Sequence, residues 1–164
     1  MHKPFAALPT LLFAVLIVAL TATGPVHAQG AVDKKLGKTL DKQKLAFEVD
    51  ADGDYKLTFD VGAGRSQVVW IRSGVSAYGD LVLREILSIG AVAPGGAVPA
   101  VLSDRMLTAN AESKLGAWAK NAGHAVFVAK VPADLEGKRL AAALELVARS
   151  ADELEREMGG ADAF

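Results

Sequence analysis

The chain has 164 residues and a nearly balanced charge, with 18 Lys and Arg against 19 Asp and Glu. This balance argues against nucleic acid as a partner, because nucleic-acid-binding proteins need a concentrated positive face to neutralise phosphates. Cysteine is absent and His124 is the only histidine after residue 28, so a zinc site of His and Cys ligands cannot be built. We expect no metal and no cofactor.

Residues 1–28 have the order of a cleaved secretory signal peptide. A positive start is followed by the unbroken apolar run Leu11–Leu20, two helix breakers and the small-residue site that ends at Ala28. The alternative is an uncleaved membrane anchor, but a span needs roughly 20 apolar residues, and this stretch contains Pro9 and is shorter. We therefore expect cleavage after Ala28, a periplasmic location without stable membrane insertion, and one domain over residues 29–164.

The first predicted element of that domain is an amphipathic helix over Ala31–Lys44. Val32, Leu36 and Leu40 recur every four residues, and lysines occupy most of the remaining surface. Such a helix can lie on a membrane surface, but this one lacks the Trp and Phe anchors of interfacial helices. A solvated outer face over an apolar stripe is the favoured interpretation.

A β-hairpin is predicted next, around the acidic segment Asp50–Asp54. Apolar residues alternate with polar ones on both sides of this segment, which is typical of paired strands. Asp50–Asp54 also resembles the first half of an EF-hand calcium loop, which requires Gly at its sixth position and Glu at its twelfth. Those positions hold Tyr55 and Val61. The segment is therefore interpreted as a turn, with weak adventitious calcium binding as the alternative.

Two further strands follow, with glycine-rich turns before each of them. Gly62–Gly64 precedes a strand over Ser66–Ser73, and a turn region over Gly74–Asp80 precedes a strand over Leu81–Ile89. The Gly-x-Gly at Gly62 does not indicate a dinucleotide loop, because the third glycine is missing and no helix follows.

The remaining elements are a helix, a second hairpin and a final helix. Pro99 begins a helix that runs to about Ala111, and strands over Leu115–Lys120 and Ala125–Val131 flank a turn at Asn121–His124. The last helix carries one apolar seam and ends at a glycine C-cap. A coiled coil would need a longer run of heptads, so packing on a sheet is favoured. The seam residues are Leu140, Leu144, Val147, Ala151, Leu154 and Met158.

The predicted order is thus α-β-β-β-β-α-β-β-α. Strands joined by short turns must be antiparallel, because parallel crossovers need a dozen or more residues. The expected fold class is α+β, with an antiparallel sheet of five to six strands and an N-terminal, a middle and a C-terminal helix that cover one face of the sheet.

The C-terminal half, Leu107–Phe164, resembles that of YbjN-domain proteins, which are related in fold to the CesT/Tir-type chaperones of type III secretion. The resemblance is carried by Leu-x-x-Asn at Leu107–Asn110, by Lys114–Trp118, by the Val126–Val131 strand and by Ala142–Leu154. It implies a chaperone-like binding module that is often a homodimer. Those secretion chaperones act in the cytoplasm, whereas this chain begins with a predicted signal peptide.

Three functions follow as hypotheses. The leading one is an exported, non-enzymatic module that holds a peptide or partner protein in the bacterial envelope. The second is a hydrolase-type enzyme with His124 as general base and Asp104 or Glu112 as its partner, although a histidine in a turn is more often solvated. The third is a structural envelope protein.

Candidate binding residues are the two tryptophans, Trp70 and Trp118. Strand alternation predicts that both lie on the more polar side of their strands, which a single layer of helices would leave open. They would then anchor a partner chain or peptide. The alternative is that both are core residues, because an error of one residue in the strand register moves every side chain to the other face.

Overall fold

The computed structural model describes residues 30–93 and 95–159, so the predicted signal peptide over residues 1–28 lies outside the described residues. The described chain contains three helices and a six-stranded antiparallel sheet, which confirms the predicted α+β class and element order. The elements are α1 (Lys34–Lys42), β1 (Glu48–Val49), β2 (Tyr55–Gly62), β3 (Arg65–Tyr78), β4 (Leu81–Val92), α2 (Ala100–Glu112), β5 (Ala117–Asn121), β6 (His124–Pro132) and α3 (Gly137–Glu157).

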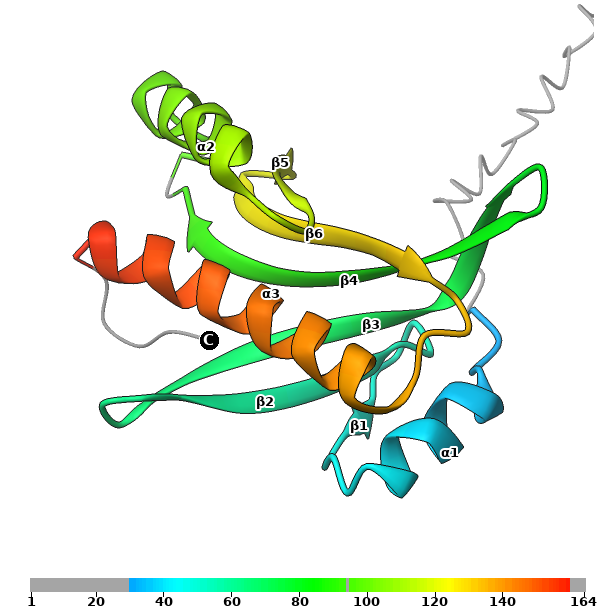
Figure 1. Cartoon of the computed structure of the whole chain (residues 1–164). Helices are drawn as coiled ribbons and strands as arrows, with labels where there is room; N and C mark the ends of the chain where they lie inside the picture. Colours follow the sequence, from blue (N-terminus) through cyan, green and yellow to red (C-terminus); the bar gives the residue numbers. More distant parts are fainter. Residues whose placement is uncertain (1–29, 94, 160–164) are drawn as a thin grey trace, which may run out of the picture.

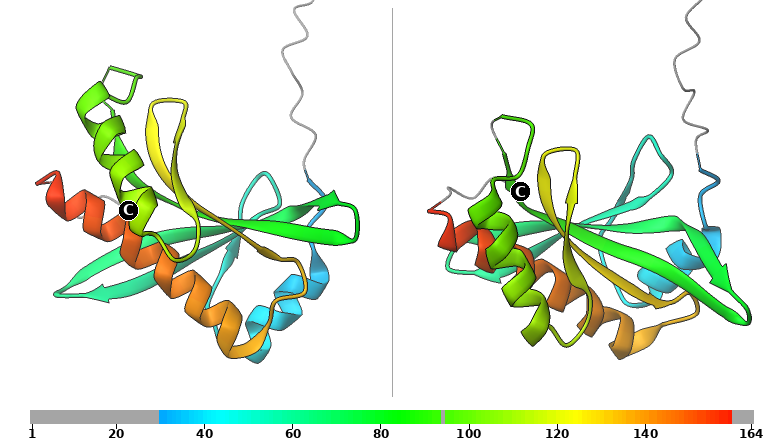
Figure 2. Two further views of the ribbon diagram at one scale, coloured as in Figure 1. Left: turned by 45° about the horizontal axis from the view of Figure 1, so that its top comes forward. Right: turned by 90° about the horizontal axis from the view of Figure 1, so that it is seen from above.

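The strands lie in the order β1-β2-β3-β4-β6-β5, so β6 pairs with β4, and β5 forms an edge. All three helices cover the same face, as Figures 1 and 2 show. Leu40 of α1 packs in the main core with Tyr55 of β2. Met106 of α2 packs in a smaller core with Ala125 of β6 and Leu154 of α3. The opposite face of the sheet carries no helix among the described residues, and we call it the open face.

Helix α3 lies across the sheet and supplies the largest share of the core (Figure 1). The predicted seam is confirmed from Leu140 to Leu154, whose members are all buried. The prediction is wrong for Met158, because this residue is the C-cap of α3 and is 54% exposed. None of the helices within residues 30–93 and 95–159 has the length and apolar character that a membrane crossing requires.

Two strand boundaries differ from the sequence-based prediction. The ladder of β1 covers only Glu48–Val49, although Phe47 still packs its ring edge-on against Tyr55, with ring centroids 5.0 Å apart. The predicted turn over Gly74–Asp80 is mostly strand, because β3 continues to Tyr78 after a register shift between Ile71 and Val75. A β-bulge absorbs an extra residue without ending a strand. Beyond it, β3 and β4 project as a two-stranded arm (Figure 1).

Asp33 links the start of the domain to the centre of the sheet. Its Oδ1 accepts hydrogen bonds from the backbone N–H groups of Lys35 and Leu36, which makes it the N-cap of α1. Its Oδ2 accepts from Nη2 of Arg84 at 2.5 Å. The Arg84 side chain is only 5% exposed and also donates to the backbone carbonyls of Arg72 and Ser73. One carboxylate thus caps a helix and neutralises a buried guanidinium.

The acidic segment Asp50–Asp54 forms the turn of the β1–β2 hairpin, as predicted. Asp50 accepts hydrogen bonds at Oδ1 from the N–H groups of Asp52 and Asp54, both at 3.0 Å. Asp54 is buried and accepts from Arg72 and from the backbone of Ser73. Two of the three carboxylates therefore hold the turn and its neighbouring strand in place, while the Asp52 residue is exposed.

We expect Asp52→Ala to change the free energy of unfolding by no more than about 0.5 kcal/mol, as for an exposed residue away from special features. Asp50→Ala should cost about 1 kcal/mol, because two backbone N–H groups lose their acceptor. Urea denaturation of both variants tests this difference. Calcium should leave the melting temperature of the wild type unchanged, and a rise that Asp52→Ala abolishes would restore the calcium-loop hypothesis.

Candidate functional site

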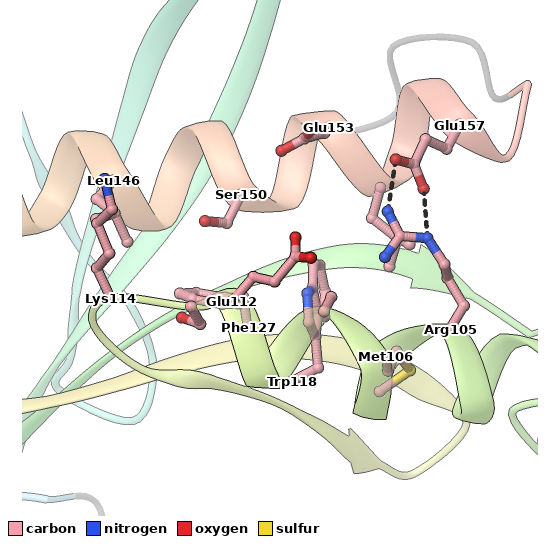
Figure 3. A pocket seen from close by; sticks show the side chains of 13 residues that line it. Arg105, Met106, Glu112, Lys114, Trp118, Phe127, Leu146, Ser150, Glu153 and Glu157 are labelled. Atoms are coloured by element: carbon pink, nitrogen blue, oxygen red, sulfur yellow. Dashed lines mark hydrogen bonds and ion pairs between the residues drawn. The ribbon is translucent and has the colours of Figure 1, made fainter.

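A cleft lies between α2 and α3, above the β5–β6 hairpin (Figure 3). We call it the interhelical cleft. Its volume is about 300 Å³. Its floor is apolar and consists of Met106, Trp118, Phe127 and Leu154. Charged side chains from both helices form its rim, and they are Arg105 and Glu112 of α2 and Glu153 and Glu157 of α3.

Asn110 of α2 holds Trp118 at the floor of the cleft. Its Oδ1 accepts a hydrogen bond from the backbone N–H of Trp118 at 2.6 Å, and its Nδ2 donates to the Trp118 carbonyl at 3.3 Å. The indole ring meets Phe127 edge-on, with ring centroids 5.3 Å apart and an interplanar angle of 73°. This orientation is a favourable one for two aromatic rings. Helix and strand are therefore joined at the residue that forms the floor.

Gly90 of β4 provides the space that the Trp118 ring fills. A Cβ atom at this position would lie 2.6 Å from Cη2 of Trp118 and 3.1 Å from the carbonyl oxygen of Ala151 in α3. Gly90 also stands at a register shift between β4 and β6. A glycine in a strand often marks a bulge or a close approach of this kind. Any larger residue would push the indole into the cleft or push α3 off the sheet.

An ion pair between the two helices closes one end of the cleft. Nε and Nη2 of Arg105 donate to the two carboxylate oxygens of Glu157 at 3.0 and 2.7 Å (Figure 3). Glu157 raises the pKa of the Arg105 guanidinium through this hydrogen bond and its charge, and Glu153 and Glu112 raise it further from a greater distance. The charged form of Arg105 is therefore favoured at this end of the cleft.

Glu112 and Glu153 face the cleft from opposite helices without a close partner of their own. Within the described part of the chain, neither carboxylate has a hydrogen bond or an ion pair within 4.0 Å. Lys114 belongs to the lining as well, and Figure 3 shows it beside Leu146, away from the Arg105–Glu157 pair. The lining thus combines an aromatic floor with three carboxylates, one of which is paired with Arg105, and with the ammonium group of Lys114, so its net charge is negative.

Trp118 does not lie on the open face, so its predicted placement is wrong. It pairs with Phe127 across the β5–β6 ladder and packs against both cores on the helix-covered face. The cause is Gly116, whose φ of +86° interrupts the regular alternation of side chains between the two faces of the sheet just before β5 begins. Leu115 and Trp118 therefore both reach the core although they are three residues apart. A φ in this range suits glycine because it lacks a Cβ.

Trp70 does lie on the open face, as predicted. Val69 and Ile71 beside it are fully buried under the helices, whereas Trp70 points the other way and is half-buried. It pairs with Lys56 on one side and with Leu87 on the other. The structure thus places the two tryptophans on opposite faces of the sheet. A binding role for Trp70 stays a prediction.

His124 lies at the start of β6 and does not line the interhelical cleft. Its Nδ1 is 3.1 Å from the carbonyl oxygen of Asn121 in the same turn. Neither Asp104 nor Glu112 is among the hydrogen-bond partners of His124 in the described residues. Nor do residues 30–93 and 95–159 contain a group of three or more His, Cys, Asp or Glu side chains arranged to hold a metal ion. The described geometry gives no support to the alternative hypothesis of an enzyme that uses His124 with Asp104 or Glu112.

The comparisons with known proteins found no matching family model and no matching curated protein.

Sequence reasoning missed most of the residues that shape the cleft. Asn110 belongs to the Leu-x-x-Asn pattern, but that pattern gave no indication that the amide would hold the backbone of Trp118. Arg105 and Glu157 are 52 residues apart, and no local spacing connects them. The weak signal that was present is Gly90, an isolated glycine inside a strand, because such glycines indicate a close approach of another group.

Proposed function

We propose that this protein is an exported, non-enzymatic binding module that holds a peptide or a segment of a partner protein in the interhelical cleft. The observation that carries the proposal is the aromatic floor of Trp118 and Phe127 under an open cavity of about 300 Å³. Ligand pockets span roughly 300–1,000 Å³. A cleft at the lower end of this range suits one or two side chains of a peptide better than a large cofactor.

The contacts around the cleft also favour binding over a merely structural role. The Asn110–Trp118 and Arg105–Glu157 interactions fix both walls before any ligand arrives. A preformed site binds with a smaller loss of conformational entropy than one that must be ordered. The resemblance of residues 107–164 to YbjN-domain proteins implies the same kind of function and stays a prediction.

The test is a selection of displayed 12-residue peptides on the Trp70→Phe variant, in which Trp118 is the only tryptophan. Selected peptides should be synthesised and titrated while the Trp118 fluorescence is followed. We expect a saturable change in emission, together with a rise in melting temperature, because a ligand that binds only the folded state stabilises it. A purely structural envelope protein would show neither change.

Two matched variants on α2 show whether binding occurs in the cleft. Ala109→Phe fills the cleft, because Ala109 lines it, whereas Ala111 is exposed on the same helix outside the lining. Ala109→Phe should abolish binding, and Ala111→Phe should retain it, with both variants shown to be folded by circular dichroism. Equal binding by the two variants, or no saturable peptide at all, would overturn the proposal.

A further inference from the structure

The geometry points to a basic peptide side chain, arginine ahead of lysine, as the occupant of the interhelical cleft. We infer that its charged end lies between Glu112 and Glu153 and that its plane rests against the Trp118 ring. This inference depends on the proposed function and names the class of residue that the cleft would select.

The lining of the cleft carries more negative than positive charge, with three glutamates against Arg105 and Lys114. Glu157 is neutralised by a bidentate ion pair with Arg105, with donor–acceptor distances of 3.0 and 2.7 Å. Glu112 and Glu153 have no such contact among the described residues, although they border the same cavity. Each of these carboxylates attracts a cation that enters the cavity. A basic ligand would give them the counter-charge that Arg105 gives Glu157.

The aromatic floor of the cleft also favours a cation. Trp118 is only half-buried and lines the cavity, and the Phe127 ring packs edge-on beside it from the neighbouring strand. Tryptophan is the best of the aromatic residues at attracting a cation to its face, and arginine is the cation most often found there. The apolar stem of an arginine would also cover Met106 and Leu154 at the floor. An acidic or a neutral side chain would gain only part of these contacts.

The rim of the cleft already holds one guanidinium, that of Arg105. Arg105 lies between α2 and α3 with its charged end against a carboxylate of α3, as Figure 3 shows. The distance between the helices thus accommodates a planar guanidinium at the end of the cleft. The middle of the cleft offers two carboxylates and an aromatic ring instead of one carboxylate. This arrangement favours arginine over the smaller and more strongly hydrated lysine.

The test uses three synthetic peptides, acetyl-Ala-Leu-Xaa-Leu-Ala-amide, in which Xaa is arginine, citrulline or glutamate. Citrulline has the shape of arginine without its charge. Titrated into the Trp70→Phe protein at low salt, the arginine peptide should bind about tenfold more tightly than the citrulline peptide, from a cation–π contact and two exposed ion pairs. The glutamate peptide should bind more weakly than both. High salt should reduce the preference for arginine.

Glu112→Gln/Glu153→Gln should abolish the arginine preference, so that the arginine and citrulline peptides bind this variant with equal affinity. The control is Glu85→Gln/Glu145→Gln, which removes the same net charge from positions outside the cleft and should keep the preference. Equal affinity for the arginine and citrulline peptides, or no saturable binding of the arginine peptide, would overturn the inference. The proposed function would still stand if the library selection yields peptides whose binding is abolished by Ala109→Phe. Failure of the arginine preference can therefore be distinguished from failure of the proposed function.

Discussion

Asp33→Ala is expected to lower the free energy of unfolding by about 3 kcal/mol. The substitution removes the N-cap of α1, which is worth about 1 kcal/mol, and leaves the Arg84 guanidinium buried without its counter-charge. Among the described residues, Arg84 would keep only the backbone carbonyls of Arg72 and Ser73 as acceptors. Urea denaturation monitored by circular dichroism measures the loss.

Two variants separate the contributions of the cap and the charge. Asp33→Asn retains a side-chain oxygen that can accept from Lys35 and Leu36, so it should lose only the ionic part, about 2 kcal/mol. Lys35→Ala, on the exposed surface of the same turn, should stay within about 0.5 kcal/mol of the wild type. A loss below about 1 kcal/mol for Asp33→Ala would show that Arg84 finds adequate partners without it.

The Asp33 interaction also predicts how stability depends on pH. Burial alone would raise the pKa of Asp33, but hydrogen bonds from the Leu36 N–H and the Arg84 guanidinium outweigh it, so that the pKa lies below its ordinary value of 3.8. The unfolded state therefore binds more protons between the two pKa values, and stability rises with pH. The contribution is complete above pH 3.8 and is lost as the pH falls through the folded-state value. Asp33→Asn should flatten this acid limb of the stability curve.

Gly90→Ala is expected to destabilise the protein by about 2 kcal/mol, which is typical of an overpacked core. The added methyl group would overlap the Trp118 ring, and the Ala151 carbonyl on α3 limits the space into which that ring could move. Trp118 should shift toward the interhelical cleft. In the Trp70→Phe background, its emission spectrum should change in the native state as well.

Gly74→Ala is the matched control, because a Cβ atom there meets nothing within 4 Å. It should be neutral or stabilising by up to about 1 kcal/mol, through the lower entropy of the unfolded chain. A double-mutant cycle assigns the cause of the Gly90 effect. In a Trp118→Leu background, Gly90→Ala should cost less than about 1 kcal/mol if the indole is the obstacle. An undiminished cost would point to the α3 backbone instead.

The fold was largely predictable because its signals are local. Glycine-rich turns separate strands of clear period-two alternation, and the seam from Leu140 to Leu154 follows helical spacing. The order of the elements and the face of Trp70 follow from these patterns alone. The one resemblance that the sequence suggested, to YbjN-domain proteins, adds the expectation of a binding role and stays a prediction.

The candidate site was not predictable, for two physical reasons. A single left-handed residue, Gly116, moved Trp118 to the opposite face, and neither the sign of a glycine φ nor its effect on a register can be read from composition. The walls of the cleft also meet through contacts between distant segments, such as Arg105 with Glu157. Such contacts depend on how α2 and α3 pack on the sheet.

The link between Asp33 and Arg84 also constrains the order in which the chain can fold as it is made. The two residues are 51 positions apart, so the ribosome completes α1 long before β4 exists to receive it. An isolated helix of nine residues is too short to be stable in water. Residues 34–42 should therefore stay unfolded until β4 has been synthesised, so the N-terminal helix is among the last elements to form although it leaves the ribosome first.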